Sequence, residues 1–159
     1  MNKAVNLLQQ YISDGQLEKA LAECKKLTEA NPQEIYLMKL LSHIYFLMEE
    51  YEKAISTTSK ILDKDPVDFD SMNNLGNYYL KLEEFEKTSF YITKAKEINP
   101  EHPAPYQNYS EMLMKKREFR NAAENLDRCI LLHEKYSNDY LTYKSTLLIR
   151  IEIFIALKE

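Results

Sequence analysis

Asparagine side chains recur at related places along the sequence, where they could bind another polypeptide. Asn6, Asn74 and Asn108 are separated by multiples of 34 residues, and Asn73 and Asn77 lie beside the second of them. A carboxamide offers both a hydrogen-bond donor and an acceptor, which is what an extended main chain needs from its partner. Because asparagine is a mediocre helix former, its concentration in helical segments indicates a role other than helix propensity.

The asparagine column is interrupted once, at Leu40, and the residues around this position differ in character. They mix apolar surface with polar or basic groups, a combination that could accept an apolar side chain and a nearby carboxylate of a ligand. The alternative is that the apolar members only pack against neighbouring helices. The surrounding residues are Tyr36, Lys39, His43, Phe46 and Leu47.

Catalytic and metal-binding chemistry finds little support. His43, His102 and His133 are far apart, and none has a carboxylate or cysteine at ligand spacing. No nucleophile motif or glycine-rich phosphate loop occurs, so we expect no enzyme activity, no cofactor and no metal site. We expect His102 and His133 to face solvent. Cys24 and Cys129 belong to no CxxC pattern and are expected to be buried small hydrophobes.

The composition indicates a soluble, all-helical protein. The 159 residues are 45% hydrophobic and 29% charged, with only 2 glycines and 5 prolines. A net charge of -4 argues against the broad basic face that nucleic-acid binding needs. The N-terminus is unlike a secretory signal, and the most apolar stretch, residues 147–157, is too short to span a bilayer. We therefore expect a cytoplasmic protein without a membrane partner.

Several columns of residues repeat with one period. Pro32, Pro66 and Pro100 are 34 residues apart. Spacings within a period are those of one helix face, so each period predicts two helices in a hairpin. The other columns are Ala20, Ala54, Thr88 and Ala122; Tyr11, Tyr45, Tyr79 and Leu113; Leu7, Leu41, Leu75 and Tyr109; and the small-residue column of Leu8, Ser42, Gly76 and Ser110.

Each column has a physical reason. Small residues such as Gly76 and Ala54 allow two backbones to approach where helices cross. The prolines end the second helix of each unit, because proline cannot continue it and costs little at the start of the next. A single hairpin cannot bury both faces, whereas stacked copies can, which predicts a solenoid.

These residues resemble the tetratricopeptide repeat family, and LGNYYLKLEEFEK is the clearest match. The resemblance implies a right-handed α-solenoid. It departs from the family pattern where the common tryptophan is absent, and where Glu134 replaces a fourth proline, so that the last helix of repeat four is expected to run on before a turn at 137–139. The predicted domains are residues 1–136 as four repeats (1–34, 35–68, 69–102 and 103–136) and residues 137–159 as a C-terminal capping or additional helix.

The resemblance also implies where partners bind. In this family the first helices line a concave surface that holds extended peptides, so the asparagines would form a ladder that grips peptide backbones. The alternative is that asparagine is simply common in this column. A clamp for the acidic tails of chaperones is disfavoured because its last basic pair is missing. The positions that match the clamp hold Lys39, His43, Asn74, Ala104 and Asn108.

Residues 139–158 favour a further helix that is apolar around most of its circumference. We expect Ile149 and Ile153 on its uncovered side, with a dimer contact, a next repeat or a downstream domain covering them. The function that the sequence favours is a protein interaction scaffold. Two alternatives stay open: an N-terminal targeting domain of a longer enzyme such as a transferase, and a self-associating structural module.

Overall fold

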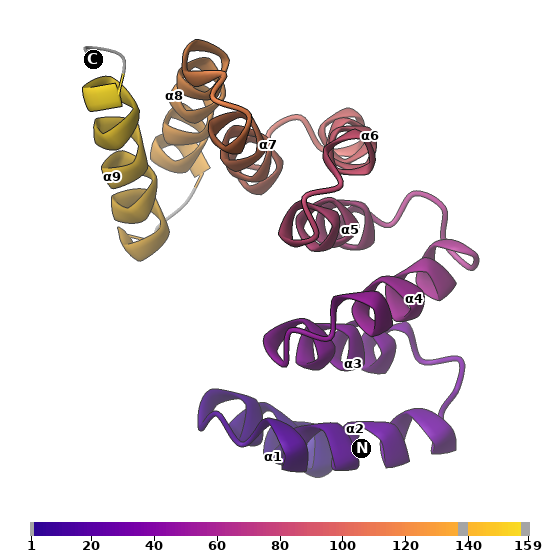
Figure 1. Cartoon of the computed structure of the whole chain (residues 1–159). Helices are drawn as coiled ribbons and strands as arrows, with labels where there is room; N and C mark the ends of the chain where they lie inside the picture. The colour runs from indigo at the N-terminus through magenta and orange to yellow at the C-terminus, as the bar shows by residue number, and fades with distance from the viewer. Residues whose placement is uncertain (1, 137–139, 157–159) are drawn as a thin grey trace. The chain divides into compact units, whose positions relative to one another are not determined.

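The chain consists of paired α-helices in the computed structural model, which describes residues 2–136 and 140–156 (Figure 1). Every regular element among these residues is helical, which confirms the all-α prediction, and the predicted turn at 137–139 lies outside them. The chain divides into two compact units, Met1–Ser71 and Met72–Glu159. The helices are α1 (Asn2–Ser13), α2 (Leu17–Ala30), α3 (Ile35–Leu47), α4 (Tyr51–Leu62), α5 (Phe69–Lys81), α6 (Phe85–Ile98), α7 (Ala104–Lys115), α8 (Phe119–Tyr136) and α9 (Tyr140–Ala156).

The turn inside each hairpin has the same backbone geometry. One residue in each turn adopts the left-handed conformation that ends many helices. In the α3–α4 turn, the Glu49 N–H donates to the Phe46 carbonyl at 3.0 Å and the Glu50 N–H donates to the Tyr45 carbonyl at 2.9 Å. These two bonds satisfy carbonyls at the end of the first helix and reverse the chain. The left-handed residues are Gly15 (φ 70°), Glu49 (φ 59°), Glu83 (φ 58°) and Arg117 (φ 60°).

In the first unit, α3 and α4 meet at small polar residues. The Ser42 hydroxyl donates to the Ala54 carbonyl at 3.2 Å and lies 2.5 Å from the Thr58 hydroxyl. All three residues are buried, so a small side chain on α3 lets the backbone of α4 approach. The buried cluster around α1, α2 and α3 consists of Leu8, Ala20, Cys24 and Ile44.

In the second unit, glycine takes the same role on α5. A Cβ atom placed on Gly76 would lie 2.5 Å from Cγ1 of Ile92 on α6, closer than real Cβ contacts come. On α7 the Ser110 hydroxyl donates to the Ala122 carbonyl at 2.9 Å. The predicted role of the small column at helix crossings is confirmed in both units.

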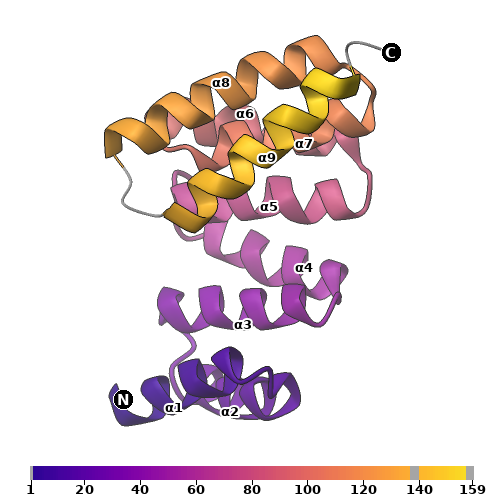
Figure 2. The same cartoon turned by 90° about the vertical axis from the view of Figure 1, so that its left-hand side faces the viewer.

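The end of the second unit departs from the repeat pattern in the predicted way. α8 runs to Tyr136, which confirms that the last helix of repeat four continues past Glu134. α9 then packs along α8 (Figure 2). The expectation that α9 is helical, rather than a strand, is confirmed for its described residues.

The predicted uncovered side of α9 is wrong. Ile153 is fully buried and Ile149 packs against the same core. An ion pair orients this face toward α8, because the Arg150 Nε donates to Asp127 Oδ1 at 2.6 Å. The apolar side chains that α9 does expose lie on the opposite side of the helix. They are Leu148, Ile151, Phe154 and Ile155.

His133 is also not where we expected it. It is buried rather than solvent-facing, because it shares the inward face of α8 with Leu126 and Cys129 at helical spacing. Cys24 and Cys129 are both buried free thiols, as expected, and burial raises the pKa of each to about 11. Neither is therefore a thiolate at neutral pH.

Lys96 on α6 is a partly buried cation inside the second unit. Its Nζ lies 3.9 Å from the ring centre of Tyr109 and 4.7 Å from that of Tyr106, and it donates to Asn125 Oδ1 at 2.8 Å. Burial lowers its pKa to about 8. These contacts link α6 to α7 and α8, so we assign Lys96 to packing between repeats.

Candidate functional site: the first-helix faces

The predicted side-chain patch of the first unit lies along one stripe of α3. Tyr36, Lys39 and His43 follow each other at spacings of three and four residues, which places them on one helix face. Tyr36 is 44% exposed, and its hydroxyl accepts a hydrogen bond from Nε2 of Gln9 on α1 at 2.8 Å. Partial desolvation lowers the pKa of His43, so its imidazole is neutral at pH 7. Asn6 is exposed on α1.

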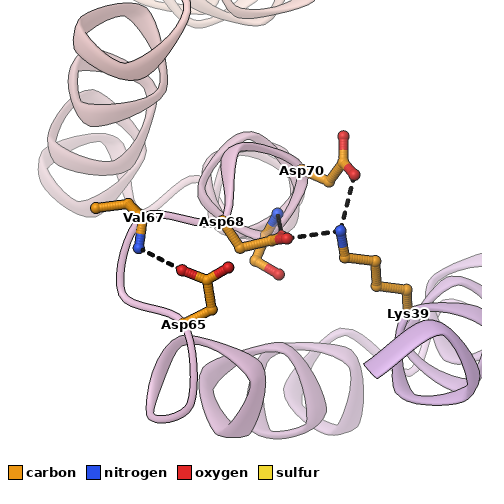
Figure 3. Close-up of polar contacts among 6 residues, drawn as sticks. Lys39, Asp65, Val67, Asp68 and Asp70 are labelled. Carbon is orange, nitrogen blue, oxygen red and sulfur yellow. Dashed lines mark hydrogen bonds and ion pairs between the residues drawn. The ribbon is translucent and has the colours of Figure 1, made fainter. Parts of the chain in front are cut away.

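Lys39 is held between two aspartates, Asp68 and Asp70, which share no repeat column with it (Figure 3). Its Nζ donates to Asp68 Oδ2 at 2.7 Å and to Asp70 Oδ2 at 2.8 Å. Burial opposes the charged form of Lys39, but the hydrogen bonds to both aspartates raise its pKa. Burial likewise opposes ionisation of Asp68, but hydrogen bonds from Lys39 and Ser71 lower its pKa. Lys39 and Asp68 therefore stabilise each other's charged form.

This ion-pair cluster also caps a helix. The Ser71 N–H donates to Asp68 Oδ1 at 2.8 Å at the start of α5, and the Val67 N–H donates to Asp65 Oδ1 at 3.2 Å in the preceding turn. Lys39 thus reaches from α3 to the chain that enters the next first helix. The available signal in the sequence was the pair of aspartates 29 and 31 residues after Lys39, slightly less than one repeat.

The second unit carries the predicted amide side chains on α5 and α7. Asn73, Asn74 and Asn77 are partly buried on α5, and Asn108 is partly buried on α7. The Asn108 Nδ2 donates to the Asn73 Oδ1 at 3.0 Å. Asn108 therefore contacts Asn73. Asn74, which occupies the same repeat column as Asn108, is the next residue after Asn73 in the sequence. This contact fixes two of the predicted amides relative to one another.

Ion pairs border this amide group at the C-terminal end of α5. The Lys81 Nζ donates to Glu111 Oε1 at 2.8 Å, and the Lys115 Nζ donates to Glu83 Oε1 at 2.8 Å. Both connect α5, or the turn that follows it, to α7. Since these side chains are substantially exposed, each pair contributes little to stability and mainly sets the local charge pattern.

The described residues offer no sign of other chemistry. Within residues 2–136 and 140–156 no group of three or more histidine, cysteine, aspartate or glutamate side chains is placed to hold a metal ion. Among the same residues, no helix combines the length and apolar character needed to cross a membrane.

Family models place the chain in a known class of repeat proteins. Two models of the tetratricopeptide repeat match residues 11–75 and 69–102, together more than half of the chain. The hairpins and the small residues at helix crossings agree with this match. The chain belongs to the tetratricopeptide-repeat family, whose fold supports protein–protein interaction.

Solved structures show the same fold at low sequence identity. A thermophilic TPR protein of Thermus thermophilus matches with a TM-score of 0.82 and 15% identity over 98% of this chain and 82% of that one. MamA from Desulfovibrio magneticus RS-1 gives 0.72 and 13% over 99% and 97%. The first TPR of Spaghetti (RPAP3), bound to an HSP90 peptide, gives 0.68 and 20% over 80% and 95%. Comparison with curated proteins gives no match.

Proposed function

We propose that this protein is an interaction module that holds an extended segment of a partner polypeptide on its first-helix faces. Asn73, Asn74, Asn77 and Asn108 bind main-chain groups of that segment. The observation that carries the proposal is the hydrogen bond of 3.0 Å between Asn108 and Asn73, which joins the amide side chains of two successive first helices. Fixed amides lose less conformational entropy when a ligand binds.

The contact between the two asparagines leaves groups that suit a main chain. It uses one N–H of Asn108 and one lone pair of the Asn73 oxygen. Among the described residues, the Asn108 Oδ1 and the Asn73 Nδ2 have no other hydrogen-bond partner. One acceptor and one donor thus remain on the two bonded side chains, which matches the N–H and C=O groups that an extended chain presents.

The side chains of α3 select among partner sequences in this proposal. Tyr36 and His43 offer an aromatic surface and a neutral imidazole. Lys39 is already paired with two aspartates, so a ligand carboxylate would compete with both for one ammonium group. We therefore assign Lys39 a positioning role and expect this stripe to prefer apolar or aromatic side chains over acidic ones.

The spacing of the amides sets the expected effect of removing them. Neighbouring packed helices lie about 8 to 10 Å apart, and an extended chain advances about 3.3 Å per residue, so Asn74 and Asn108 would contact main-chain groups about three residues apart. Each neutral hydrogen bond contributes about 0.5 to 1.5 kcal/mol. Loss of both should weaken binding by about 5-fold to 150-fold.

The test uses dodecapeptides selected on the wild-type chain from a random phage-displayed library. Affinities of the selected peptides are then measured for the Asn74→Ala, Asn108→Ala double variant. The loss should be similar for peptides of different sequence, whereas Tyr36→Ala or His43→Ala should change which peptides are preferred. The matched control is Asn121→Ala on the exposed surface of α8, which should bind normally. Unchanged affinity of the double variant, with its helical circular dichroism intact, would move the binding site elsewhere.

A further inference from the structure

A small cavity is lined by residues of α7, α8 and α9 in the second unit. Its volume is about 160 Å³. Pockets for drug-sized ligands usually measure about 300 to 1,000 Å³, so this cavity suits a single side chain. The residues that line it are Gln107, Glu111 and Met114 of α7, Leu126 of α8, and Ile149 and Glu152 of α9.

The cavity combines an apolar lining with carboxylates. Met114, Ile149 and the fully buried Leu126 contribute the apolar part. Glu111 and Glu152, which carry carboxylates, line the cavity from two different helices. A long side chain with an apolar stem and a charged end fits such a combination, because lysine and arginine bury their methylene groups while the charged end stays near polar groups.

The charges around the cavity favour a cation. The carboxylate of Glu111 already accepts a hydrogen bond from Lys81 at 2.8 Å. Glu152 is exposed, and it forms no ion pair with any residue that the structure describes. Lys81 offsets one of these two negative charges, and Lys115, which also acts on Glu111, is itself paired with Glu83, so the charge of Glu152 is left uncompensated among the described residues. An acidic ligand side chain would be repelled, an apolar one would gain nothing from Glu152, and a neutral hydrogen-bond donor would gain less than a cation.

We propose that this cavity binds the side chain of one lysine or arginine of the partner polypeptide. The stem packs on Met114 and Ile149, and the cation pairs with Glu152 and shares Glu111 with Lys81. Gln107 and Asn108 both belong to α7, so the cavity and one of the amides that bind the main chain lie on the same helix. The inference rests on the proposed function, because the basic residue belongs to the same bound segment.

The first test compares peptide selections on wild-type, Glu152→Gln and Glu152→Lys chains. Wild type should enrich lysine or arginine at one peptide position, and Glu152→Gln should weaken binding of those peptides by about 2-fold to 5-fold, the range for partly exposed ion pairs. Glu152→Lys should change the preference at that position to acidic residues. The matched control is Glu124→Gln, which removes the same charge from the exposed surface of α8 and should change nothing.

The second test does not need a high-affinity partner. The side-chain methyl NMR signal of Met114, assigned with Met114→Leu, is followed during titration with the capped tripeptide Gly-Lys-Gly or its norleucine analogue. The lysine peptide should shift the signal in wild type more than in Glu152→Gln, and the norleucine peptide should shift it less. Equal shifts with both peptides would overturn the assignment of the cavity to a cation.

The outcomes separate this inference from the proposed function. Peptides that bind through the asparagines but show no basic preference, or a preference that Glu152→Gln leaves unchanged, would overturn the cavity proposal alone. If no peptide is selected, the proposed function fails. The inference about a bound partner segment then fails with it.

Discussion

The two units present different chemistry on the same type of helix. On the first unit the side chains of α3 are an aromatic ring, an imidazole and a lysine whose charge is paired with Asp68 and Asp70. On the second unit α5 and α7 present neutral amides joined by the contact between Asn108 and Asn73. Inside each unit, however, small residues and alanines hold the hairpins together in the same way.

The residues that pack the helices together therefore differ from the residues that a partner would contact. Ser42 donates to the Ala54 carbonyl in the first unit, and Ser110 donates to the Ala122 carbonyl in the second, because the helix crossing allows only small side chains there. Residues on the first-helix faces are not limited to small side chains in this way. A charged side chain can therefore stand in one repeat where an amide side chain stands in the next. Mutations at the two kinds of position should therefore differ in both size and type of effect.

The largest expected effect tests the helix crossings. Gly76→Ser introduces the residue that two other repeats carry, but the new side chain would collide with the buried Ile92 on α6. We expect a loss of about 1 to 3 kcal/mol in the free energy of unfolding, the usual cost of overpacking a core. Ser42→Ala, which only loses its hydrogen bonds, should cost about 1 kcal/mol. Urea denaturation measures both.

Equal losses for Gly76→Ser and Ser42→Ala would contradict the conclusion that the crossing of α5 and α6 leaves no room for a side chain at Gly76. A stabilised Gly76→Ser variant would show that α6 can move away from α5 without cost.

A smaller effect tests the charged face of the first unit. Lys39→Met should cost about 1 to 2 kcal/mol at neutral pH, because Asp68 is 14% exposed at its side chain and loses a charged partner. The pKa of Asp68 is lowered from 3.8 in the folded state, so this contribution is present above pH 3.8 and is lost as the pH falls through the folded value. The difference in the free energy of unfolding between wild type and Lys39→Met should therefore disappear in strong acid.

The second unit provides the comparison for this prediction. Lys81→Met removes the ion-pair partner of Glu111, whose side chain is 42% exposed and so more exposed than that of Asp68. This change should alter the free energy of unfolding by less than about 0.5 kcal/mol. Denaturation curves of both variants, each compared with wild type at neutral pH and well below pH 3.8, give the four changes in the free energy of unfolding that the comparison needs. A pH-independent loss for Lys39→Met would show that its methylene packing, rather than its charge, stabilises the first unit.

The smallest effect concerns the hairpin turns. Glu49 has a φ of 59°, which strains any residue except glycine, so Glu49→Gly should stabilise the protein by about 0.5 to 1 kcal/mol. Glu52→Gly, in the first turn of α4, should instead cost about 1 kcal/mol because glycine weakens a helix. Thermal denaturation of both variants checks the opposite signs. Destabilisation by Glu49→Gly would show that the glutamate side chain makes a contribution larger than its backbone strain.

The repeat columns carried most of the fold prediction. The period of 34 residues placed the small residues at helix crossings and the paired helices along the chain. The period does not extend past repeat four, as the absence of a fourth proline at Glu134 predicted, because α8 continues to Tyr136 before α9 begins at Tyr140. The column pattern therefore gave no correct position for Ile149 and Ile153, and it assigned no role to Glu152.

The candidate site was predictable only in part, for a similar reason. A column can indicate that Asn74 and Asn108 occupy equivalent places, because equivalence is a property of sequence. It cannot indicate that Asn108 contacts Asn73, since that contact depends on how side chains of adjacent helices interlock. The pairing of Lys39 with Asp68 and Asp70 was missed because these residues belong to different columns.

The sequence by itself determined the helical hairpins, their period and the residue types on the first helices, because helix periodicity and small-residue spacing are local properties of the chain. Only the tertiary structure decided which side chains meet. Left-handed φ values at Glu49, Glu83 and Arg117 follow from the bonds that close each hairpin, although nothing in those residue types favours them. The cavity that Glu152 and Glu111 line depends on how α9 packs on α8, which no repeat column encodes.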